Sequence, residues 1–329
     1  MHRRRFLSTA LSAVLSVTPS SAQNIRQVRR IGVLMGIKEA PYPLSVLAQF
    51  RARLRELGWI EESNLHIDVF WSDNSIDKAR ELAQAVLDLK PDLLVGHTDS
   101  SVIALLERTR SIPIVFVTVS DPIGLGFVKS LSHPGGSATG FVNFEPSLGG
   151  KWLDILKEIA PQVRRAVMIY NPKTAPRAAE VYSPSLLAAG KIREVVIEII
   201  QIKEEEDIEK TLTSLGREPG SGLIVVPDNF VTDRTPLIIS LCARYNLPAI
   251  HPYPYFPTAG GLLSYGIDPV DTFRKAPDYI DRILRGARPE ELSVQLPTKF
   301  QLIINLKTSK AFGLTVPATL MAIADRVIE

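Results

Sequence analysis

The sequence has 329 residues, of which 45% are hydrophobic, and a formal net charge of +3. Three arginines lie within residues 1–22, which contain no acidic residue, and removing them leaves 35 basic side chains against 35 acidic ones. This balance gives no support to nucleic-acid binding. The remaining chain of about 300 residues is larger than one ordinary hydrophobic core, so two lobes are expected.

Residues 1–22 have the pattern of a secretory signal. Three arginines at residues 3–5 precede a short apolar run, and small residues lead to Ala22, after which cleavage is predicted. The apolar run is far shorter than the roughly 20 residues that a membrane-spanning helix needs, so the mature chain is not expected to insert into a membrane. Phe6 and Leu7 after the arginines also resemble a twin-arginine signal. A disordered or amphipathic arm is the alternative.

From residue 30 onward, apolar strands alternate with amphipathic helices. The first series predicts strands at 31–35, 67–71, 92–96, 114–118 and 138–142, with helices after the first two. A helical stripe from Trp152 to Ile159 then restarts the pattern, and strands follow at 166–170, 195–200 and 223–226. Strict alternation is typical of parallel sheets with right-handed crossovers. Two such series predict an α/β protein with two doubly wound parallel-sheet lobes.

The residues after about 260 are too few for a third domain. They predict a strand at 260–266, a helix at 270–284 and a strand at 300–305. Each must join a sheet that is already present, so the chain is expected to cross between the lobes more than once, through a multi-crossover hinge. The predicted boundaries are residues 23–142 plus about 262–291 for lobe 1, and 143–261 plus about 292–329 for lobe 2.

Polar turns follow four of the predicted strands, two in each lobe. Ligands of open parallel sheets bind beyond the carboxyl ends of the strands, so two facing lobes are expected to direct these turns at one cleft. The candidate ligand-binding residues are Thr98, Asp99, Ser100, Ser120, Asp121, Asn171, Asp228 and Asn229, with Tyr265 at the end of a later strand.

Each of these residues has a structural alternative. Ser, Thr, Asp and Asn before a helix are favoured N-caps, so the turns are explained without a ligand. Asp228 is a partner for a ligand ammonium group, but a cap or an ion pair with Arg234 would satisfy it as well. Aromatic side chains of the Pro-rich segment 251–257, which we expect to lack regular structure, are suited to stack on a flat ligand or to pack as an interlobe loop: Tyr253, Tyr255 and Phe256.

Motifs of catalysis and metal binding do not emerge from the sequence. Gly149-Gly150-Lys151 lacks the upstream glycine of a phosphate-binding loop, and Trp152 follows where Ser or Thr is needed. The histidines are scattered, and none forms a His-x-x-x-His pair. The single cysteine, Cys242, lies in an apolar helical stretch and is expected to be buried. We therefore expect no catalytic residues, no metal and no cofactor.

Several short stretches, taken in order, resemble the ABC transporter substrate-binding proteins related to tryptophan- and tyrosine-binding receptors. The stretches are Arg30-Ile31-Gly32-Val33-Leu34, Leu54-Arg55-Glu56-Leu57-Gly58-Trp59, Pro113-Ile114-Val115-Phe116, Ser120-Asp121-Pro122-Ile123-Gly124, Gly135-Gly136-Ser137-Ala138-Thr139-Gly140, Pro227-Asp228-Asn229, Gly260-Gly261-Leu262-Leu263-Ser264-Tyr265-Gly266 and Ile304-Asn305-Leu306-Lys307.

The resemblance implies a fold similar to type I periplasmic binding proteins, a small-molecule ligand, and permease and ATPase partners. It also implies pocket residues at 98–100, 120–121 and 228–229. One departure concerns His97-Thr98-Asp99, which stand where the family often has small residues, and they weigh against an unmodified amino acid as ligand.

The leading hypothesis is a periplasmic receptor of an importer for an aromatic amino acid or a related aromatic compound. A receptor that reports ligand occupancy to a membrane sensor is the second hypothesis, and an exported α/β enzyme is the third.

Overall fold

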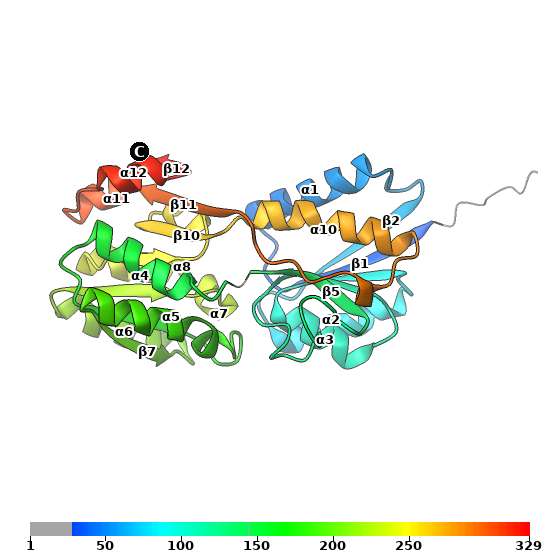
Figure 1. Cartoon of the computed structure of the whole chain (residues 1–329), viewed down its shortest axis with the longest axis horizontal. Helices are drawn as coiled ribbons and strands as arrows, with labels where there is room; N and C mark the ends of the chain where they lie inside the picture. The colour runs from blue at the N-terminus through cyan, green and yellow to red at the C-terminus, as the bar shows by residue number, and fades with distance from the viewer. Residues whose placement is uncertain (1–27, 144) are drawn as a thin grey trace, which may run out of the picture.

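The structure, a computed structural model, describes residues 28–143 and 145–329, so the predicted signal lies outside the described residues. Two lobes lie side by side along the long axis, and each consists of one sheet with helices on both faces (Figure 1). Within the described part of the chain, no helix is both long and apolar enough to span a membrane.

Lobe 1 contains a parallel sheet with the strand order β2-β1-β3-β4-β5. Every residue of β3 and β4 is buried, as expected for central strands of a parallel sheet that is covered on both faces. Helices α1 and α10 pack on one face, and α2 and α3 pack on the other. The elements are β1 (Arg29–Met35), α1 (Pro41–Glu56), β2 (Leu65–Trp71), α2 (Ile76–Asp88), β3 (Leu93–His97), α3 (Asp99–Arg108), β4 (Ile114–Val119), β5 (Ala138–Val142), α10 (Pro269–Leu284) and the 3₁₀ turn η1 (Pro289–Glu291).

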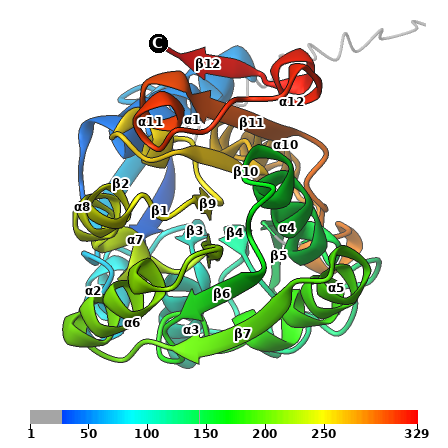
Figure 2. The same cartoon turned by 90° about the vertical axis from the view of Figure 1, so that its left-hand side faces the viewer.

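Lobe 2 contains a larger sheet with the strand order β12-β11-β10-β9-β8-β6-β7, seen from its own side in Figure 2. Helices α4 and α5 pack on one face, and α6 and α8 pack on the other. The elements are α4 (Leu148–Ile159), β6 (Arg165–Tyr170), α5 (Ala178–Arg193), β7 (Val196–Gln201), α6 (Glu205–Arg217), β8 (Ser221–Val225), α7 (Asn229–Asp233), α8 (Thr235–Tyr245), β9 (Ala249–His251), α9 (Tyr255–Thr258), β10 (Leu263–Ile267), β11 (Phe300–Asn305), α11 (Leu306–Ala311), α12 (Ala318–Ile323) and β12 (Arg326–Ile328).

The chain passes between the lobes three times: after β5, between β10 and α10, and before β11. The predicted lobe boundary at residue 262 differs from the observed path, because β10 pairs with β9 and β11 in the sheet of lobe 2. The chain therefore enters lobe 1 only at α10. It stays there to Gln295, which forms a parallel bridge with Phe141 of β5.

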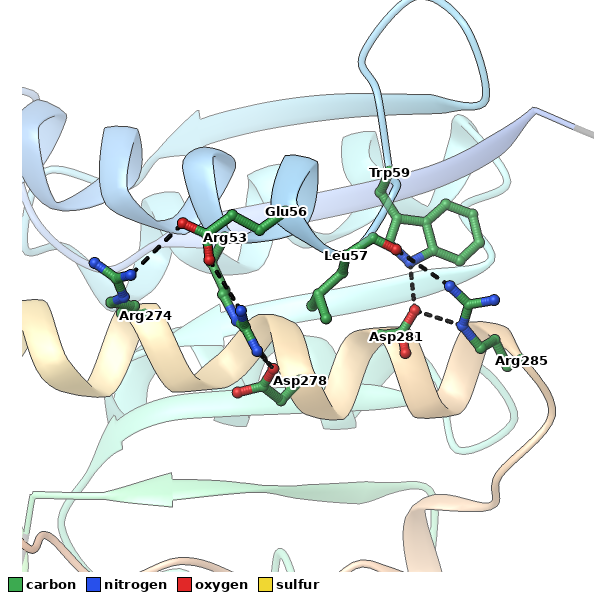
Figure 3. A network of polar contacts seen from close by, with 8 residues as sticks. All are labelled: Arg53, Glu56, Leu57, Trp59, Arg274, Asp278, Asp281 and Arg285. Carbon is green, nitrogen blue, oxygen red and sulfur yellow. Dashed lines mark hydrogen bonds and ion pairs between the residues drawn. The ribbon is translucent and has the colours of Figure 1, made fainter.

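Helix α10 is fastened to α1 by a polar network on the surface of lobe 1 (Figure 3). Arg53 of α1 donates to the Asp278 carboxylate of α10 at 2.7 Å. Trp59 Nε1 donates to Asp281 at 2.9 Å, and Arg285 donates to the same carboxylate at 2.6 Å. Beneath this network, buried side chains of both helices share one core cluster. A late segment of the chain thus completes the first lobe.

Two sequence-based expectations differ from the structure. The segment 251–257 was expected to lack regular structure, but β9 and α9 extend into it. Pro254 precedes α9 and Pro257 lies within its first turn, where a proline removes no helical hydrogen bond. The sheets are parallel except for β10 and β11, which pair antiparallel because the chain returns from lobe 1 beside the strand by which it left.

Candidate functional site

A cavity of about 300 Å³ lies between the lobes, at the carboxyl ends of strands from both sheets. Its volume is at the lower end of the range for small-molecule sites, roughly 300–1,000 Å³. Aromatic and aliphatic side chains make up much of its lining. The residues that line it are Met35, Ile37, Lys38, Ala40, Tyr42, Pro43, Val46, Asn74, His97, Thr98, Thr118, Asn229, Thr232, Asp233, Tyr253, Tyr255, Pro269 and Phe273.

The wall from lobe 1 contains backbone in sparsely populated conformations. Asn74, Thr98 and Thr118 all line the cavity with positive φ, at 60°, 75° and 60°. Thr118 occupies an irregularity in the pairing of β4 with β5. Positive φ is unusual for β-branched residues, and each such residue costs of order 1–3 kcal/mol. Strain of this kind gathers at functional sites when the surrounding fold imposes it.

Three buried polar atoms on the same wall have no hydrogen-bond partner among residues 28–143 and 145–329: Asn74 Oδ1, His97 Nδ1 and Thr118 Oγ1. His97 and Thr118 are 7% and 5% exposed. Desolvation lowers the pKa of His97 to about 3, so its imidazole is neutral at physiological pH. Buried polar groups are nearly always hydrogen-bonded in native proteins. These three uncharged groups are therefore available to form hydrogen bonds with a ligand.

The wall from lobe 2 is aromatic. Tyr253 and Tyr255 stack with ring centroids 5.5 Å apart, and Tyr42 of lobe 1 approaches Tyr255 at 6.1 Å. The Tyr255 hydroxyl donates to Thr232 Oγ1 at 3.1 Å. Burial raises the pKa of Tyr253 and Tyr255 far above the ordinary value, so both hydroxyls stay protonated. These rings give the cavity an aromatic, uncharged lining on the side of lobe 2.

Direct contacts hold the two walls together. The side-chain amide of Asn229 in lobe 2 donates to the Gly36 carbonyl at 3.1 Å and to Thr98 Oγ1 at 3.4 Å. Gly36 is required there, because a Cβ atom would lie 1.9 Å from Thr98 Oγ1. Lys38 and Asp233 form an ion pair at 3.0 Å from opposite lobes. The lobes are therefore closed around the cavity.

Among the predicted site residues, Thr98 and Asn229 line the cavity. Asp99, Ser100 and Ser120 are buried close to it without appearing in its lining. Asp99 accepts a hydrogen bond from Ser120 N at 2.8 Å, and Ser100 Oγ lies 3.1 Å from Thr98 Oγ1. Burial raises the pKa of Asp99 to about 6 despite that hydrogen bond.

Asp228 and Asn171 are joined to each other rather than directed at the cavity. Asp228 is the N-cap of α7 and accepts from Phe230 N at 2.8 Å and from Thr174 Oγ1 at 2.5 Å. Asn171 N also donates to its carboxylate. Burial raises the pKa of Asp228 above its ordinary value, while these donors oppose the rise. Arg234, the alternative ionic partner, instead lies over the Phe230 ring at 3.6 Å.

Asp121 and Tyr265 lie away from the cavity lining. Asp121 pairs across the lobe boundary with Arg177 at 3.0 Å and borders a separate hollow with it. Tyr265 stacks on Phe300 with centroids 5.9 Å apart. Its carbonyl accepts from Trp152 Nε1 at 2.7 Å. Tyr265 is the middle residue of β10, the strand from which the chain passes to α10 of lobe 1.

Four residues that line the cavity were not predicted from the sequence: Tyr42, Asn74, Thr118 and Phe273. Tyr42 and Asn74 follow β1 and β2, so the rule that ligands bind beyond strand ends would have found them had it been applied to these turns too. Thr118 was assigned to a regular strand at 114–118, and Phe273 fell within the helix predicted at 270–284 without being singled out. The described residues contain no group of three or more side chains that would hold a metal ion.

A family model described as ABC transporter substrate binding protein matches residues 33–328. A relative named tyrosine-binding protein, from Clostridioides difficile (strain R20291), is 26% identical over 265 residues, which are 80% of this chain and 75% of the relative. The solved structure of an ABC domain in complex with L-Trp, from Streptococcus pneumoniae, has a TM-score of 0.83 at 23% identity and covers 91% of this chain and 99% of its own. A conserved domain protein from Vibrio cholerae has a TM-score of 0.83 at 24% identity, with coverage of 92% and 100%.

Proposed function

The chain belongs to the ABC transporter substrate-binding protein family and has the two-lobed α/β fold of type I periplasmic binding proteins, and we propose on that premise that it is the periplasmic solute receptor of an importer. Its ligand is a small aromatic compound, an aromatic amino acid or a relative of one. The observation that carries the proposal is the aromatic cavity enclosed between the lobes. A permease and an ATPase are the partners that the family implies.

Residues of the cavity have different roles in this proposal. Thr98 and Asn229 contact the ligand and each other across the cleft. Asp99, Ser100 and Ser120 hold the turn that carries Thr98, and Asn171 and Asp228 hold the turn that carries Asn229. Asp121 stabilises the closed arrangement through Arg177, and Tyr265 lies in the hinge.

Binding is tested by thermal denaturation of the protein after removal of residues 1–22, with a panel of aromatic amino acids and other small aromatic compounds. A ligand present at 100 times its dissociation constant stabilises the folded state by roughly 2.7 kcal/mol. We expect at least one aromatic compound to raise the melting temperature and an aliphatic amino acid such as leucine to leave it unchanged. A melting temperature that no aromatic compound moves would remove the proposed ligand class.

Import and export need tests of their own. Deletion of the gene should abolish uptake of the radiolabelled aromatic compound by intact cells, and the intact gene should restore it. A deletion strain with normal uptake and a lost transcriptional response to the compound would instead indicate a sensory receptor. Mass spectrometry of the periplasmic protein should find an N-terminus at Gln23.

A further inference from the structure

The charged side chains that line the interlobe cavity, among the described residues, are already paired with each other. Among the described residues that line it, the charged ones are Lys38 and Asp233, which pair with each other at 3.0 Å. The Lys38 side chain is 58% exposed, so this pair lies towards solvent and leaves no free charge to the interior. A charged ligand would have to break the pair or remain unneutralised, and an unpaired charge in a buried site is costly.

The carboxylates behind the lining are also occupied. Asp228 accepts from three backbone amides and from the Thr174 hydroxyl. Asp268 caps α10 and pairs with Lys299 at 2.8 Å. Asp99 accepts from Ser120 N and lies in the first turn of α3, where its own carboxylate compensates the positive end of that helix. An ammonium group therefore meets no free acid among these residues. The first turn of α1 reaches the lining and contains no acidic residue, but it has few donors for a carboxylate. Pro41 and Pro43 have no N–H, and Leu44 N already donates to the Ala40 carbonyl.

The partners that the cavity does offer are neutral. The unpartnered atoms Asn74 Oδ1, His97 Nδ1 and Thr118 Oγ1 belong to an amide, an uncharged imidazole and a hydroxyl. His97 and Thr118 are more than nine-tenths buried, so their polar atoms are cut off from solvent as well as from other protein groups. Phe273 packs against the His97 ring at 5.2 Å and keeps the surroundings of this imidazole apolar.

From these observations we infer that the cavity selects an uncharged aromatic or heteroaromatic molecule that hydrogen-bonds to Asn74, His97 and Thr118, in preference to a zwitterionic amino acid. The inference rests on the proposed function and narrows its ligand class. The aromatic body of the ligand lies against Tyr253, Tyr255 and Phe273, and its polar group faces the strained wall of lobe 1.

The test varies ligand charge on a constant ring. Isothermal titration calorimetry compares indole-3-acetamide, which is neutral, with tryptophan, tryptamine and indole-3-acetate, which are zwitterionic, cationic and anionic. A second series compares 4-hydroxyphenylacetamide with tyrosine, tyramine and 4-hydroxyphenylacetate. We expect the neutral member of at least one series to bind at least tenfold more tightly than its three charged analogues.

The outcomes separate the two proposals. A charged member that binds as tightly as the neutral one would overturn the inference and leave the aromatic receptor intact. Absence of binding by every member of both series would count against the aromatic receptor itself, and the inference would fall with it.

Thr118→Val supplies the second measurement, because it removes one unpartnered hydroxyl while keeping the branched shape. We expect it to weaken binding of the neutral probe by roughly 2- to 13-fold, the range for one neutral hydrogen bond. The matched control is Ser221→Ala, which removes an equally unpartnered buried hydroxyl at the start of β8, away from the cavity. Melting curves verify that both variants fold. Equal affinities for Thr118→Val and the wild type would contradict the assigned role of Thr118.

Discussion

The two walls of the interlobe cavity are built from the same kind of sheet but differ in how far their polar groups are satisfied. In lobe 1, Thr98 and Thr118 hold strained backbone, and His97 and Thr118 have buried atoms without partners. In lobe 2, the lining residues Asn229 and Tyr255 have hydrogen-bond partners of their own. This difference underlies our proposal that lobe 1 supplies hydrogen bonds to the ligand and that lobe 2 supplies aromatic surface.

The largest effect is expected from truncating one buried phenylalanine in each lobe. Phe273 lines the cavity from lobe 1, and Phe256 packs beneath β9 in lobe 2 without lining it. Each change to Ala should lower the free energy of unfolding by about 3–5 kcal/mol, measured by urea denaturation. Only Phe273→Ala should also weaken binding of an aromatic probe. Equal losses of affinity in both variants would contradict the prediction that only the phenylalanine in the cavity lining contributes to binding.

Acid should destabilise both lobes through one buried histidine in each. The pKa values of His97 and His251 are lowered from 6.5 to about 3 by desolvation. The stability that these neutral imidazoles contribute to the folded state is therefore fully present above pH 6.5 and is lost as pH falls towards 3. At pH 4.5 each costs about 3 kcal/mol relative to pH 7. His97→Phe and His251→Phe should each flatten the pH dependence of urea unfolding by that amount. The variant with both substitutions reports the effects of the carboxylates, which are subtracted from the wild-type values. A corrected wild-type free energy of unfolding that does not change between pH 6.5 and 4.5 would refute this prediction.

Replacement of a buried aspartate by asparagine should change the melting temperature in opposite directions in the two lobes. The pKa of Asp99 is raised from 3.8 to about 6, so the folded state loses stability as pH rises from about 4 to 6, by at most about 3 kcal/mol. Asp99→Asn keeps an acceptor for Ser120 N and should raise the melting temperature at pH 7.5. Asp228→Asn should lower the melting temperature. The NH₂ group of the new side chain would face a backbone N–H, that of Asn171 or that of Phe230, where a carboxylate oxygen accepts a hydrogen bond in the wild type. A higher melting temperature in both variants would show that the hydrogen bonds to Asp228 do not compensate for the burial of its charge.

The smallest effect is expected at one of the two ion pairs that the described residues form between the lobes, Asp121–Arg177. Arg177→Ala removes the contact with Asp121, and exposed pairs are worth about 0–1 kcal/mol. We expect a slightly larger radius of gyration in small-angle X-ray scattering without a measurable loss of stability. Arg193→Ala, which breaks a pair with Asp154 inside lobe 2, is the control and should leave the radius unchanged. An identical response of both variants would mean that the interlobe pair does not favour closure.

Much of the fold was predictable from the periodicity of apolar residues, and the family resemblance and the two-lobed α/β class are confirmed. The strand predicted at 300–305 coincides with β11, and that at 138–142 coincides with β5. The three-residue strands β9 and β12 are too short to show a period. The antiparallel pairing of β10 with β11 depends on the chain's path through lobe 1, which no local pattern contains.

The cavity was predictable in position but not in composition. Polar turns at strand ends led to Thr98 and Asn229, which line it. A similar polar turn at Asp228 forms a helix cap instead. Residue type alone does not say whether a carboxylate points at a ligand or at its own backbone. The role of Thr118 depends on a local irregularity of β4, and that of Phe273 depends on a helix returning from the other lobe.

The attachment of α10 to α1 has a consequence for synthesis of the chain. About 200 residues separate the two helices, so at 5–20 residues per second a ribosome needs roughly 10–40 s after finishing α1 before it completes α10. During that interval the face of the first sheet that α1 shares with α10 is only partly covered, and Phe50 and Leu54 lack the partners that α10 brings. The N-terminal lobe of the nascent chain therefore matures late and is the part most in need of chaperone protection.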